Sequence, residues 1–542
     1  MYLDIAFNVL GGLGIFLFGM DSMSSGMQKL AGQRLKKILA LLTTNRVIAI
    51  LMGMFVTMLV QSSSVSTVMT IGFVNASLLT LKQALGVIFG ANIGTTITGW
   101  ILVLNIGKYG LPMVGAGAIL YMFLKGEKAK TRALTFMGLG MIFLGLQLMS
   151  NGLKPVRSMP EFVRLFSLFS ADSYFGVLKV AFVGALITAI VQSSSATLGI
   201  TITLAVQGLI DYPTAVALVL GENVGTTITA FLATLNANAN AKRAAYAHTI
   251  INTIGVIWVT GIFPYYLDFL SNFGSPEANI TMAIATAHTM FNVSNVIIFT
   301  PFIGILADFL TKIVKDDEKT SERITHIDEL MLKTPSVVVG QTKTEVLTMG
   351  KNISEMFSTL KDIYQSNRSI SEDEVKRMRK IEDDLDIYQK EITTANFIIL
   401  NNKNITDNLK IDTKNNLEVC DEYETISDYF VRIAKNLKKL HDNDIELSDS
   451  KIQKLSYLHG CVSRLFHDVN KAYEEKDKEA FIKAIILANH ITDKFRETRT
   501  YHLENTAKVE ASAMFSTSYM DILNHYRRIR DHIFNIIEVF TR

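Results

Sequence analysis

Cysteine is nearly absent from this sequence, and a strong charge of one sign is lacking. Cys420 and Cys461 are the two cysteines among 542 residues, so no disulfide framework is expected and a reducing compartment fits. The formal net charge is +3, which gives no basis for nucleic-acid binding. We therefore expect a protein without disulfides that does not act on nucleic acid.

Charge is also scarce in one long part of the chain. Residues 1–312 contain 28 Asp, Glu, Lys and Arg, whereas the 230 residues that follow contain 75. The first part is too poor in charge for an ordinary soluble surface, and several of its apolar runs are long enough to span a bilayer. We expect a membrane domain at residues 1–312, a polar linker at 313–344 and a soluble helical domain at 345–542.

The membrane part contains an internal repeat. Residues 57–98 align without a gap with residues 188–229, at an offset of 131, and 17 of the 42 pairs are identical. The identities concentrate in glycines and polar residues, which argues against chance similarity between two apolar helices. Each copy holds the tetrapeptide Gln-Ser-Ser-Ser, followed by Gly-x-Asn-x-Gly-Thr-Thr-Ile-Thr. We expect two repeats, at about residues 5–125 and 132–312.

Lysine and arginine predict the orientation of the membrane part. The first apolar stretch, about residues 5–27, has no basic segment before it and several Lys and Arg after it. It should be a retained helix with its N-terminus outside. The chain is then a multi-pass protein of the cell (cytoplasmic) membrane, with its C-terminal domain in the cytoplasm. Further crossing helices are predicted at residues 82–104, 110–125, 132–153, 213–235, 245–270 and 280–312.

This orientation requires that the two Gln-Ser-Ser-Ser segments do not cross the membrane. The apolar arms beside each tetrapeptide are about 13–15 residues long, whereas a crossing helix needs about 20. We expect two re-entrant helical hairpins with the tetrapeptides at their tips, opening to opposite sides, so that the repeats are inverted. The alternative is one long, tilted, spanning helix with a polar kink in each repeat. The arms are residues 47–60, 65–79, 178–191 and 196–210.

The tetrapeptides suit an anion. Where a hairpin reverses, a new helix starts whose first N–H groups are unpaired, and serine is a favoured N-cap there. Helix N-termini carry partial positive charge, so two of them directed at one point would hold an anion. Glutamine adds amide donors and acceptors. The candidate anion-binding residues are Gln61, Ser62, Ser63, Ser64, Gln192, Ser193, Ser194 and Ser195.

The Gly-x-Asn-x-Gly-Thr-Thr blocks suit a hard cation. Their glycines loosen the helix and free backbone carbonyls, and Asn and Thr add side-chain oxygens. For each Gly or Thr taken alone, close helix packing is the alternative role. No Lys or Arg lies in either motif, so co-bound cations would balance a multivalent anion. The candidate cation ligands are Ser64, Asn92, Thr95, Thr96, Ser195, Asn223, Thr226 and Thr227.

Glu222 stands inside the second block, where the first block has Ala91. Carboxylates inside a membrane are costly and are functional by default. Glu222 either takes part in cation coupling or pairs with a nearby group at the bundle surface. The sequence leaves both roles open.

The two tetrapeptides, each followed by its Gly-x-Asn-x-Gly-Thr-Thr block, closely resemble those of the type II sodium/phosphate cotransporter family, including its bacterial members. The resemblance covers roughly residues 8–305. It implies inorganic phosphate as substrate, sodium as the co-transported ion, and the motif residues named above as the transport site. The number of sodium ions is not implied, because members vary at the positions of Ala91 and Glu222.

Apolar residues of the soluble part recur at helical spacing in six segments, which suggests two three-helix bundles. This arrangement resembles the PhoU family of phosphate-response proteins. Glu424 and Asp428 are similar to an acidic motif that binds metal in that family, which implies a divalent or transition metal here. Ordinary solvated helix faces are the alternative. The stretch Arg527–His532 keeps Asp-His but has Arg where the family has Glu. The six segments are residues 345–366, 372–402, 409–442, 448–475, 478–508 and 511–541.

We therefore expect an all-α polytopic membrane protein followed by a soluble PhoU-like pair of bundles. Its expected activity is sodium-coupled secondary transport of inorganic phosphate by alternating access, with phosphate held between the two hairpin tips in the lipid bilayer. The alternatives are a phosphate exporter and a membrane protein that senses phosphate without coupled uptake. An enzyme is not expected, because the apolar part shows no paired nucleophile and base. The helical tail would regulate the chain or help it to form a homodimer.

Overall fold

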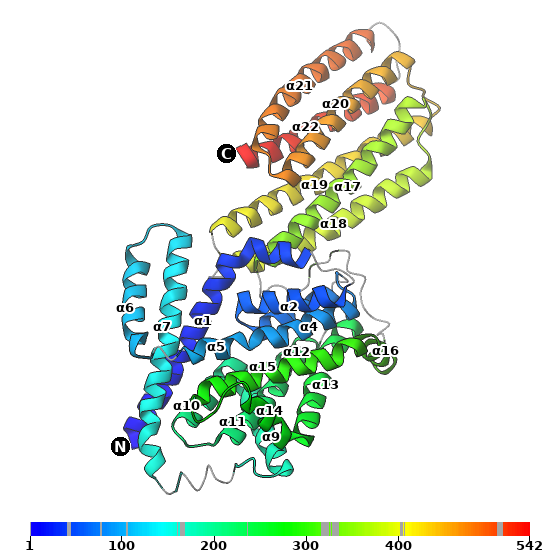
Figure 1. Cartoon of the computed structure of the whole chain (residues 1–542). Helices are drawn as coiled ribbons and strands as arrows, with labels where there is room; N and C mark the ends of the chain where they lie inside the picture. The colour runs from blue at the N-terminus through cyan, green and yellow to red at the C-terminus, as the bar shows by residue number, and fades with distance from the viewer. Residues whose placement is uncertain are drawn as a thin grey trace. The chain divides into compact units, whose positions relative to one another are not determined.

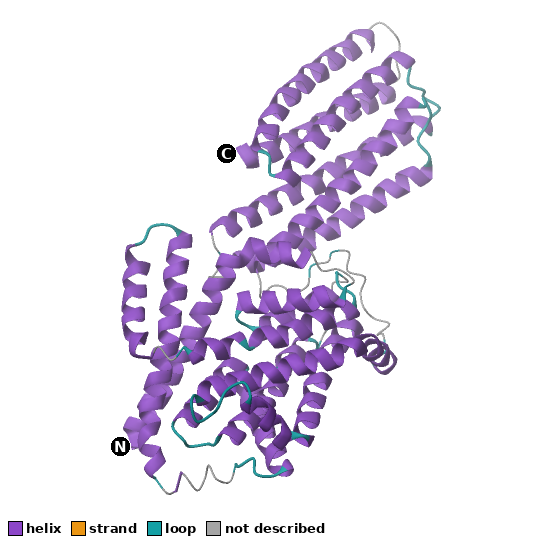
Figure 2. Cartoon of the chain, viewed as in Figure 1, coloured by secondary structure: helices purple, strands orange, loops and turns teal. Residues whose placement is uncertain are grey.

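The computed structural model describes residues 2–40, 45–75, 78–104, 107–159, 161–162, 169–235, 237–315, 325, 327, 335–401, 405, 407–506 and 513–541. Every regular element in these residues is a helix, as predicted, and they contain no strand (Figure 2). The chain divides into two compact units. The first comprises Met1–Ser321 and Asp328–Val337, and the second comprises Glu322–Ile327 and Val338–Arg542.

The first unit, labelled α1 to α16 in Figure 1, combines long helices with pairs of short ones. Its elements are α1 (Tyr2–Ala40), α2 (Arg46–Val60), α3 (Ser63–Asn75), α4 (Leu81–Thr95), α5 (Ile97–Val103), α6 (Gly107–Phe123), α7 (Glu127–Leu153), η1 (Lys154–Ser158), α9 (Tyr174–Val191), α10 (Ser194–Val206), α11 (Tyr212–Gly225), α12 (Thr227–Ala233), α13 (Ala239–Gly261), α14 (Phe263–Ser271), α15 (Ile280–Phe299), η2 (Thr300–Phe302) and α16 (Ile303–Ile313).

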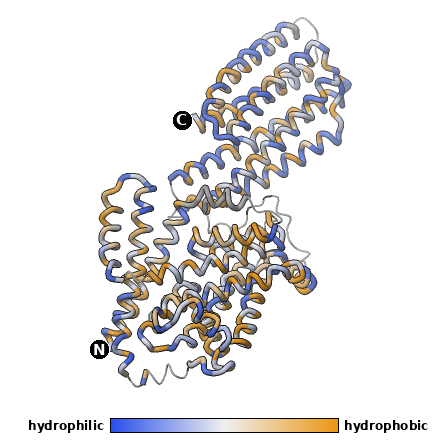
Figure 3. Tube along the Cα trace, in the orientation of Figure 1, coloured by the Kyte–Doolittle hydropathy of each residue, from blue (hydrophilic) through white to orange (hydrophobic). Residues whose placement is uncertain are grey.

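Six stretches of this unit are long and apolar enough to cross a membrane, or seven if the bent pair α13 and α14 counts as one, within the residues that the structure describes. Several of these helices therefore make the chain a multi-pass membrane protein. The helices of this unit are coloured mainly white to orange, whereas hydrophilic positions recur along the tail (Figure 3). The six stretches are Tyr2–Leu30, Leu81–Val103, Glu127–Ser158, Tyr174–Val191, Tyr212–Ala233 and Ile280–Ile313.

Three predicted elements differ from the structure. The crossing predicted at 110–125 corresponds to α6, whose 17 residues are not among the six stretches, although α6 lies against α7 (Figure 1). By contrast, α9 begins at Tyr174 and its 18 residues are long enough to cross, so it is more than the short arm predicted at 178–191. The crossing predicted at 245–270 bends by 85° between α13 and α14. Pro264 lies in the first turn of α14 and cannot supply the N–H that would continue α13.

Glycines bring two helix pairs into backbone contact, and they do so twice at the offset of the sequence repeat. α2 packs against α4, and α9 packs against α11. At each contact a Cβ on the glycine would collide with the facing backbone, so a larger residue does not fit there. The corresponding contacts are Gly53 with Val87 and Gly184 with Leu218, Gly90 with Ile50 and Gly221 with Ala181, and Gly94 with Met54 and Gly225 with Ala185.

The second unit contains the six helices predicted for the tail, and their buried side chains form one continuous hydrophobic core. The first of them begins earlier than predicted, inside the segment expected to be a linker, because Val338 and Val339 are buried and Asn416 donates a hydrogen bond to the Val339 carbonyl at 3.0 Å. The helices are α17 (Pro335–Gln365), α18 (Glu372–Leu400), α19 (Asp407–His441), α20 (Asp449–Glu475), α21 (Lys478–Thr506) and α22 (Ala513–Thr541).

The glycine contacts predict a specific sensitivity to a single methyl group. Gly90→Ala and Gly221→Ala should each lower the free energy of unfolding by about 1–3 kcal/mol, because the new Cβ collides with the carbonyl oxygen of Ile50 or Ala181. The measurement is thermal unfolding of the purified chain in detergent. Gly14→Ala is the control, since a Cβ there meets nothing within 4 Å. Equal unfolding temperatures for all three variants would contradict the packing described here.

Candidate functional site

Both tetrapeptides lie at a break between two helices, and the backbone turns in the same way at each. Gln61 follows the last residue of α2 and Gln192 follows the last residue of α9, and both glutamines have left-handed backbones, with φ of 54° and 55°. The N–H of each glutamine donates to a threonine carbonyl four residues earlier, at 2.7 Å. Glutamine is seldom found in this conformation, which costs about 1–2 kcal/mol relative to the right-handed one. The helix–turn–helix at each tetrapeptide is therefore duplicated in detail.

The first serine of each tetrapeptide caps the helix that follows the turn. The Ser62 hydroxyl accepts a hydrogen bond from the Val65 N–H at 3.3 Å, and the Ser193 hydroxyl accepts one from the Ala196 N–H at 3.2 Å. A cap of this kind satisfies one of the orphan N–H groups at a helix start and leaves the earlier ones for another acceptor. Each tip thus presents N–H groups, serine hydroxyls and the positive end of a helix, which is the arrangement predicted for an anion.

The two tips differ in burial. The side chain of Gln61 is 7% exposed and its Nε2 donates to the Met58 carbonyl at 2.6 Å. The side chain of Gln192 is exposed. Ser63 and Ser194, the second serines of the two tips, are both buried. One tip is therefore more enclosed by protein than the other, despite their identical sequences.

The Gly-x-Asn-x-Gly-Thr-Thr blocks also break a helix in both repeats. α4 gives way to α5 at Thr96, and α11 gives way to α12 at Thr226. The hydroxyl of Thr96 donates to the Ile93 carbonyl, and that of Thr227 donates to the Val224 carbonyl, both at 2.8 Å. The loosened helix predicted from the glycines is present at both blocks.

Each tip helix packs against the helix that follows the block of the other repeat. α10, which begins in the second tetrapeptide, lies against α5, and α3, which begins in the first, lies against α12. The hydroxyl of Ser195 donates to that of Thr98 at 3.4 Å, which joins the second tip to the end of the first block. The two repeats therefore contact each other at both tip helices, and at the second tip a hydrogen bond between polar side chains joins them.

Two side-chain clusters hold the asparagines of the blocks. Oδ1 of Asn92 lies 2.9 Å from Nε2 of His248, and Nδ2 of Asn92 donates to Oδ1 of Asn252 at 3.3 Å. Oδ1 of Asn223 accepts from Nδ2 of Asn292 at 3.0 Å and lies 3.4 Å from Nε2 of His288. All six side chains are buried. Both predicted cation ligands, Asn92 and Asn223, thus already have side-chain partners.

The sequence favours interhelical contacts for Asn252 and Asn292, and the structure confirms them. Sequence analysis did not place these asparagines or the two histidines beside the blocks, although a signal for that placement exists. The hexapeptide Ala-His-Thr-x-x-Asn occurs at residues 247–252 and again at 287–292, an offset of 40 and not of 131. Its His and Asn lie four residues apart, on one face of a helix. α13 thus supplies one pair to the first block, and α15 supplies the other pair to the second block.

Glu222 is the one position where the two blocks differ in charge. Its side chain has no exposed surface, and neither carboxylate oxygen has a hydrogen-bond partner among the described residues. The nearest ionisable partner is His288, whose Nε2 lies 3.6 Å from Oε1 of Glu222. Glu222 therefore has a nearby ionisable group, as one of the two predicted roles requires. Both side chains lie inside the packed helices, whereas the pairing was predicted at the bundle surface. A carboxylate without hydrogen bonds at such a place leaves room for a further partner.

The acidic residues that the structure describes in the tail do not gather into a metal centre. Glu424 faces Asp386 and Asp428, and burial together with these neighbours raises the pKa of Glu424. Asp428, however, is ion-paired with Arg432. No group of three or more His, Cys, Asp or Glu side chains within the described chain is arranged to hold a metal. The metal implied for Glu424 and Asp428 is therefore not supported.

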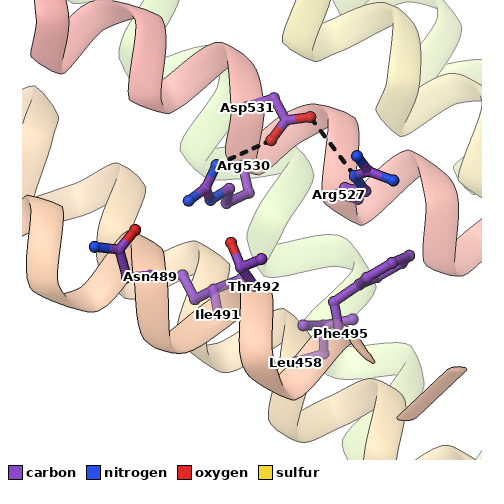
Figure 4. Close-up of a pocket in the computed structure, with 8 residues that line it drawn as sticks. All are labelled: Leu458, Asn489, Ile491, Thr492, Phe495, Arg527, Arg530 and Asp531. Atoms are coloured by element: carbon purple, nitrogen blue, oxygen red, sulfur yellow. Dashed lines mark hydrogen bonds and ion pairs between the residues drawn. The ribbon is translucent and has the colours of Figure 1, made fainter. Parts of the chain in front are cut away.

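The Asp-His pair of α22 is also occupied. Asp531 lies 3.0 Å from Nη1 of Arg530 and 3.9 Å from Nε of Arg527, and these three side chains border a cavity of about 180 Å³ (Figure 4). His532 binds Glu422 with 2.6 Å between Nδ1 and Oε2. The arginines of this segment thus neutralise Asp531, and His532 is paired with Glu422.

Comparison with known families finds one family model in the membrane part of the chain and another in its tail. The Na+/Pi-cotransporter family model matches residues 15–151 and 163–274, and the PhoU domain model matches residues 455–540. Both tetrapeptides and both blocks lie within the first match. The second match covers α21, most of α20 and almost all of α22.

Several curated proteins are similar to this chain. The "Putative inorganic phosphate export protein YjbB" of Escherichia coli (strain K12) is 26% identical over 70% of this chain and 68% of its own length. The "Uncharacterized protein YqeW" of Bacillus subtilis (strain 168) is 28% identical over 56% of this chain and 96% of its own length. The "Sodium-dependent phosphate transport protein 2B" of Homo sapiens is 41% identical over 18% of this chain and 14% of its own length. No solved structure matches the chain.

The left-handed turns predict how substitutions at Gln192 affect stability. The free energy of unfolding of Gln192→Gly should exceed that of Gln192→Ala by about 1 kcal/mol, which thermal unfolding measures, because glycine adopts this backbone conformation without steric cost. Both variants lose the glutamine side chain, so their difference reports the backbone alone. Ala189→Gly, in the regular part of α9, is the control and should be destabilising. A Gln192→Ala variant as stable as Gln192→Gly would rule out the turn.

Proposed function

We propose that the protein moves inorganic phosphate across the cell membrane together with sodium, because the Na+/Pi-cotransporter family model matches most of its membrane part. The single observation that supports this most is the duplicated helix–turn–helix, in which each serine-capped helix packs against the other repeat. The proposal includes the orientation of the chain, with the N-terminus outside and the tail in the cytoplasm. It also includes assembly of two chains into a homodimer.

Phosphate binding is assigned to the two tips. The tip residues are Gln61–Ser64 and Gln192–Ser195, and each tip offers backbone N–H groups, hydroxyl groups and a helix N-terminus. Hydrogen bonds from such donors to an ion are each worth about 1.5–3 kcal/mol, so several together can replace the water that phosphate loses. The tips carry no Lys or Arg, so the remaining negative charge needs sodium nearby.

Sodium binding is assigned to hydroxyl oxygens beside the tips and to Glu222. Hydroxyls that donate to a backbone carbonyl, as those of Thr96 and Thr227 do, keep lone pairs for a cation. Ser64, Ser195, Thr95 and Thr226 complete this set. Asn92 and Asn223 act by positioning the helix breaks, because their oxygens are held by histidine and asparagine side chains.

Alternating access is supported by the unequal burial of the tips. Gln61 is enclosed while Gln192 is exposed, although the two backbones have the same conformation. An inverted pair of re-entrant hairpins needs this kind of inequality, because one tip must be covered whenever the other is open. The second state would then expose Gln61 and bury Gln192.

Export is the second candidate function. The relative matched over 70% of this chain carries phosphate export in its name. Coupling to sodium favours uptake wherever the sodium gradient points inward, so an exporter would need a different driving force. The two functions share one binding site and differ in the direction of net flux.

Transport of labelled phosphate into reconstituted vesicles tests the site. Changing Ser62, Ser63, Ser193 and Ser194 to Ala should reduce sodium-driven flux at least tenfold, because several hydrogen bonds to the ion are lost. Ser271→Ala with Ser275→Ala, at exposed positions outside the motifs, should leave flux unchanged. Undiminished flux in the four-serine variant would remove the site assignment. Flux that ignores the sodium gradient would remove the coupling, and net efflux would assign export.

A second experiment tests Glu222. Glu222→Gln keeps the size of the side chain and removes its charge, so the sodium concentration for half-maximal flux should rise about tenfold while phosphate flux persists at high sodium. Asp21→Asn is the matched control, because Asp21 is an acid of α1 with an exposed side chain. If the sodium dependence of Glu222→Gln matched that of the Asp21→Asn control, Glu222 would have no part in coupling.

A further inference from the structure

A groove of about 380 Å³ lies in the tail, between one face of α17 and one face of α20. On α17 it is bordered by Phe357 and Lys361, and on α20 by His459, Ser463 and Arg464, at the spacing of a single helix face. All of these residues belong to the second unit, so the groove does not depend on the membrane domain.

Basic side chains and hydrogen-bond donors border the groove. Lys361, Arg464 and His467 border it together with Ser456 and Ser463, and no acidic residue is among the described residues that line it. Lys361 has no ion pair in the described part of the chain, and Arg464 has one long contact, 3.9 Å from Asp468. The neighbouring cavity at α21 and α22 differs, because Asp531 neutralises its arginines (Figure 4). Positive charge is therefore available in the groove between α17 and α20.

A buried histidine in the groove wall lacks a partner for one nitrogen. Nδ1 of His459 lies 2.9 Å from the Tyr526 hydroxyl, which donates in turn to Tyr364 at 3.1 Å. Nδ1 is then the protonated nitrogen, and Nε2 carries a free lone pair. Nε2 is buried and has no partner among the described residues. Burial lowers the pKa of His459 to about 4, so its ring is neutral at pH 7.

We propose that this groove binds inorganic phosphate, so that the tail carries a phosphate site of its own. Lysine and arginine balance the negative charge, and serine hydroxyls and the guanidinium donate to the oxygens. Phosphate retains a proton at neutral pH, and that O–H, directly or through one water, satisfies the acceptor on His459. The groove volume of about 380 Å³ is room for one phosphate ion with its closest waters. This site goes beyond the transport function and does not depend on it.

Equilibrium dialysis of labelled phosphate against the full chain in detergent tests this proposal. The background carries Ser62, Ser63, Ser193 and Ser194 as Ala, so that binding at the tips is suppressed. One saturable site should remain, and Lys361→Gln with Arg464→Gln should weaken its affinity at least tenfold. Lys483→Gln with Arg499→Gln removes the same charge from exposed positions of α21 and should leave the affinity unchanged. Equal weakening in the two double variants would overturn the proposal.

Two further arms define the ligand and the groove. Sulfate has the size of phosphate but no proton at neutral pH, so it should compete at least tenfold more weakly than phosphate. Equal competition by sulfate, or tighter binding of AMP than of phosphate, would overturn the assignment to inorganic phosphate. Gly460→Leu should abolish binding by filling the groove, since a Cβ at Gly460 meets nothing within 4 Å and leucine favours the helix. Unchanged binding in this variant would place the phosphate elsewhere.

Discussion

The structure of the membrane unit depends on one constraint, which is that polar groups surrounded by apolar helices need partners. An unpaired polar group costs several kcal/mol in hydrocarbon, so helices break there only where something satisfies the freed groups. At the tips, the serine hydroxyls of Ser62 and Ser193 cap the new helices. At the blocks, threonine hydroxyls bind the backbone, and asparagines bind side chains from α13 and α15. The same solution occurs twice because the sequence is duplicated.

Much of this arrangement could be predicted because its determinants lie close together in the sequence. A tetrapeptide with three serines, between two apolar arms, indicates a helix end and a cap within a few residues. The glycines of the blocks likewise indicate a helix break, and the breaks occur at Thr96 and Thr226. Six periodic segments predicted the six tail helices, because each one buries a single apolar face. Local chemistry was sufficient for these features.

Features that depend on which helices pack together could not be predicted in the same way. His248 and His288 come from helices outside the aligned repeat, so the offset of 131 gives no sign of their roles. The position of Glu222 beside His288 also depends on tertiary packing. The bend after α13 had a local cause, Pro264, but apolar residues continue on both sides of it and suggested one uninterrupted helix.

The glycine contacts also determine where this unit can change shape. Backbones that touch, as those of α2 and α4 do through Gly90 and those of α9 and α11 through Gly221, cannot slide without losing that fit. Each such pair should therefore travel as a rigid body. The compliant points are then the hinges at Thr96 and Thr226, where one helix yields to the next. A ligand bound beside those hinges would sit where a small rotation is amplified into displacement of an entire helix pair.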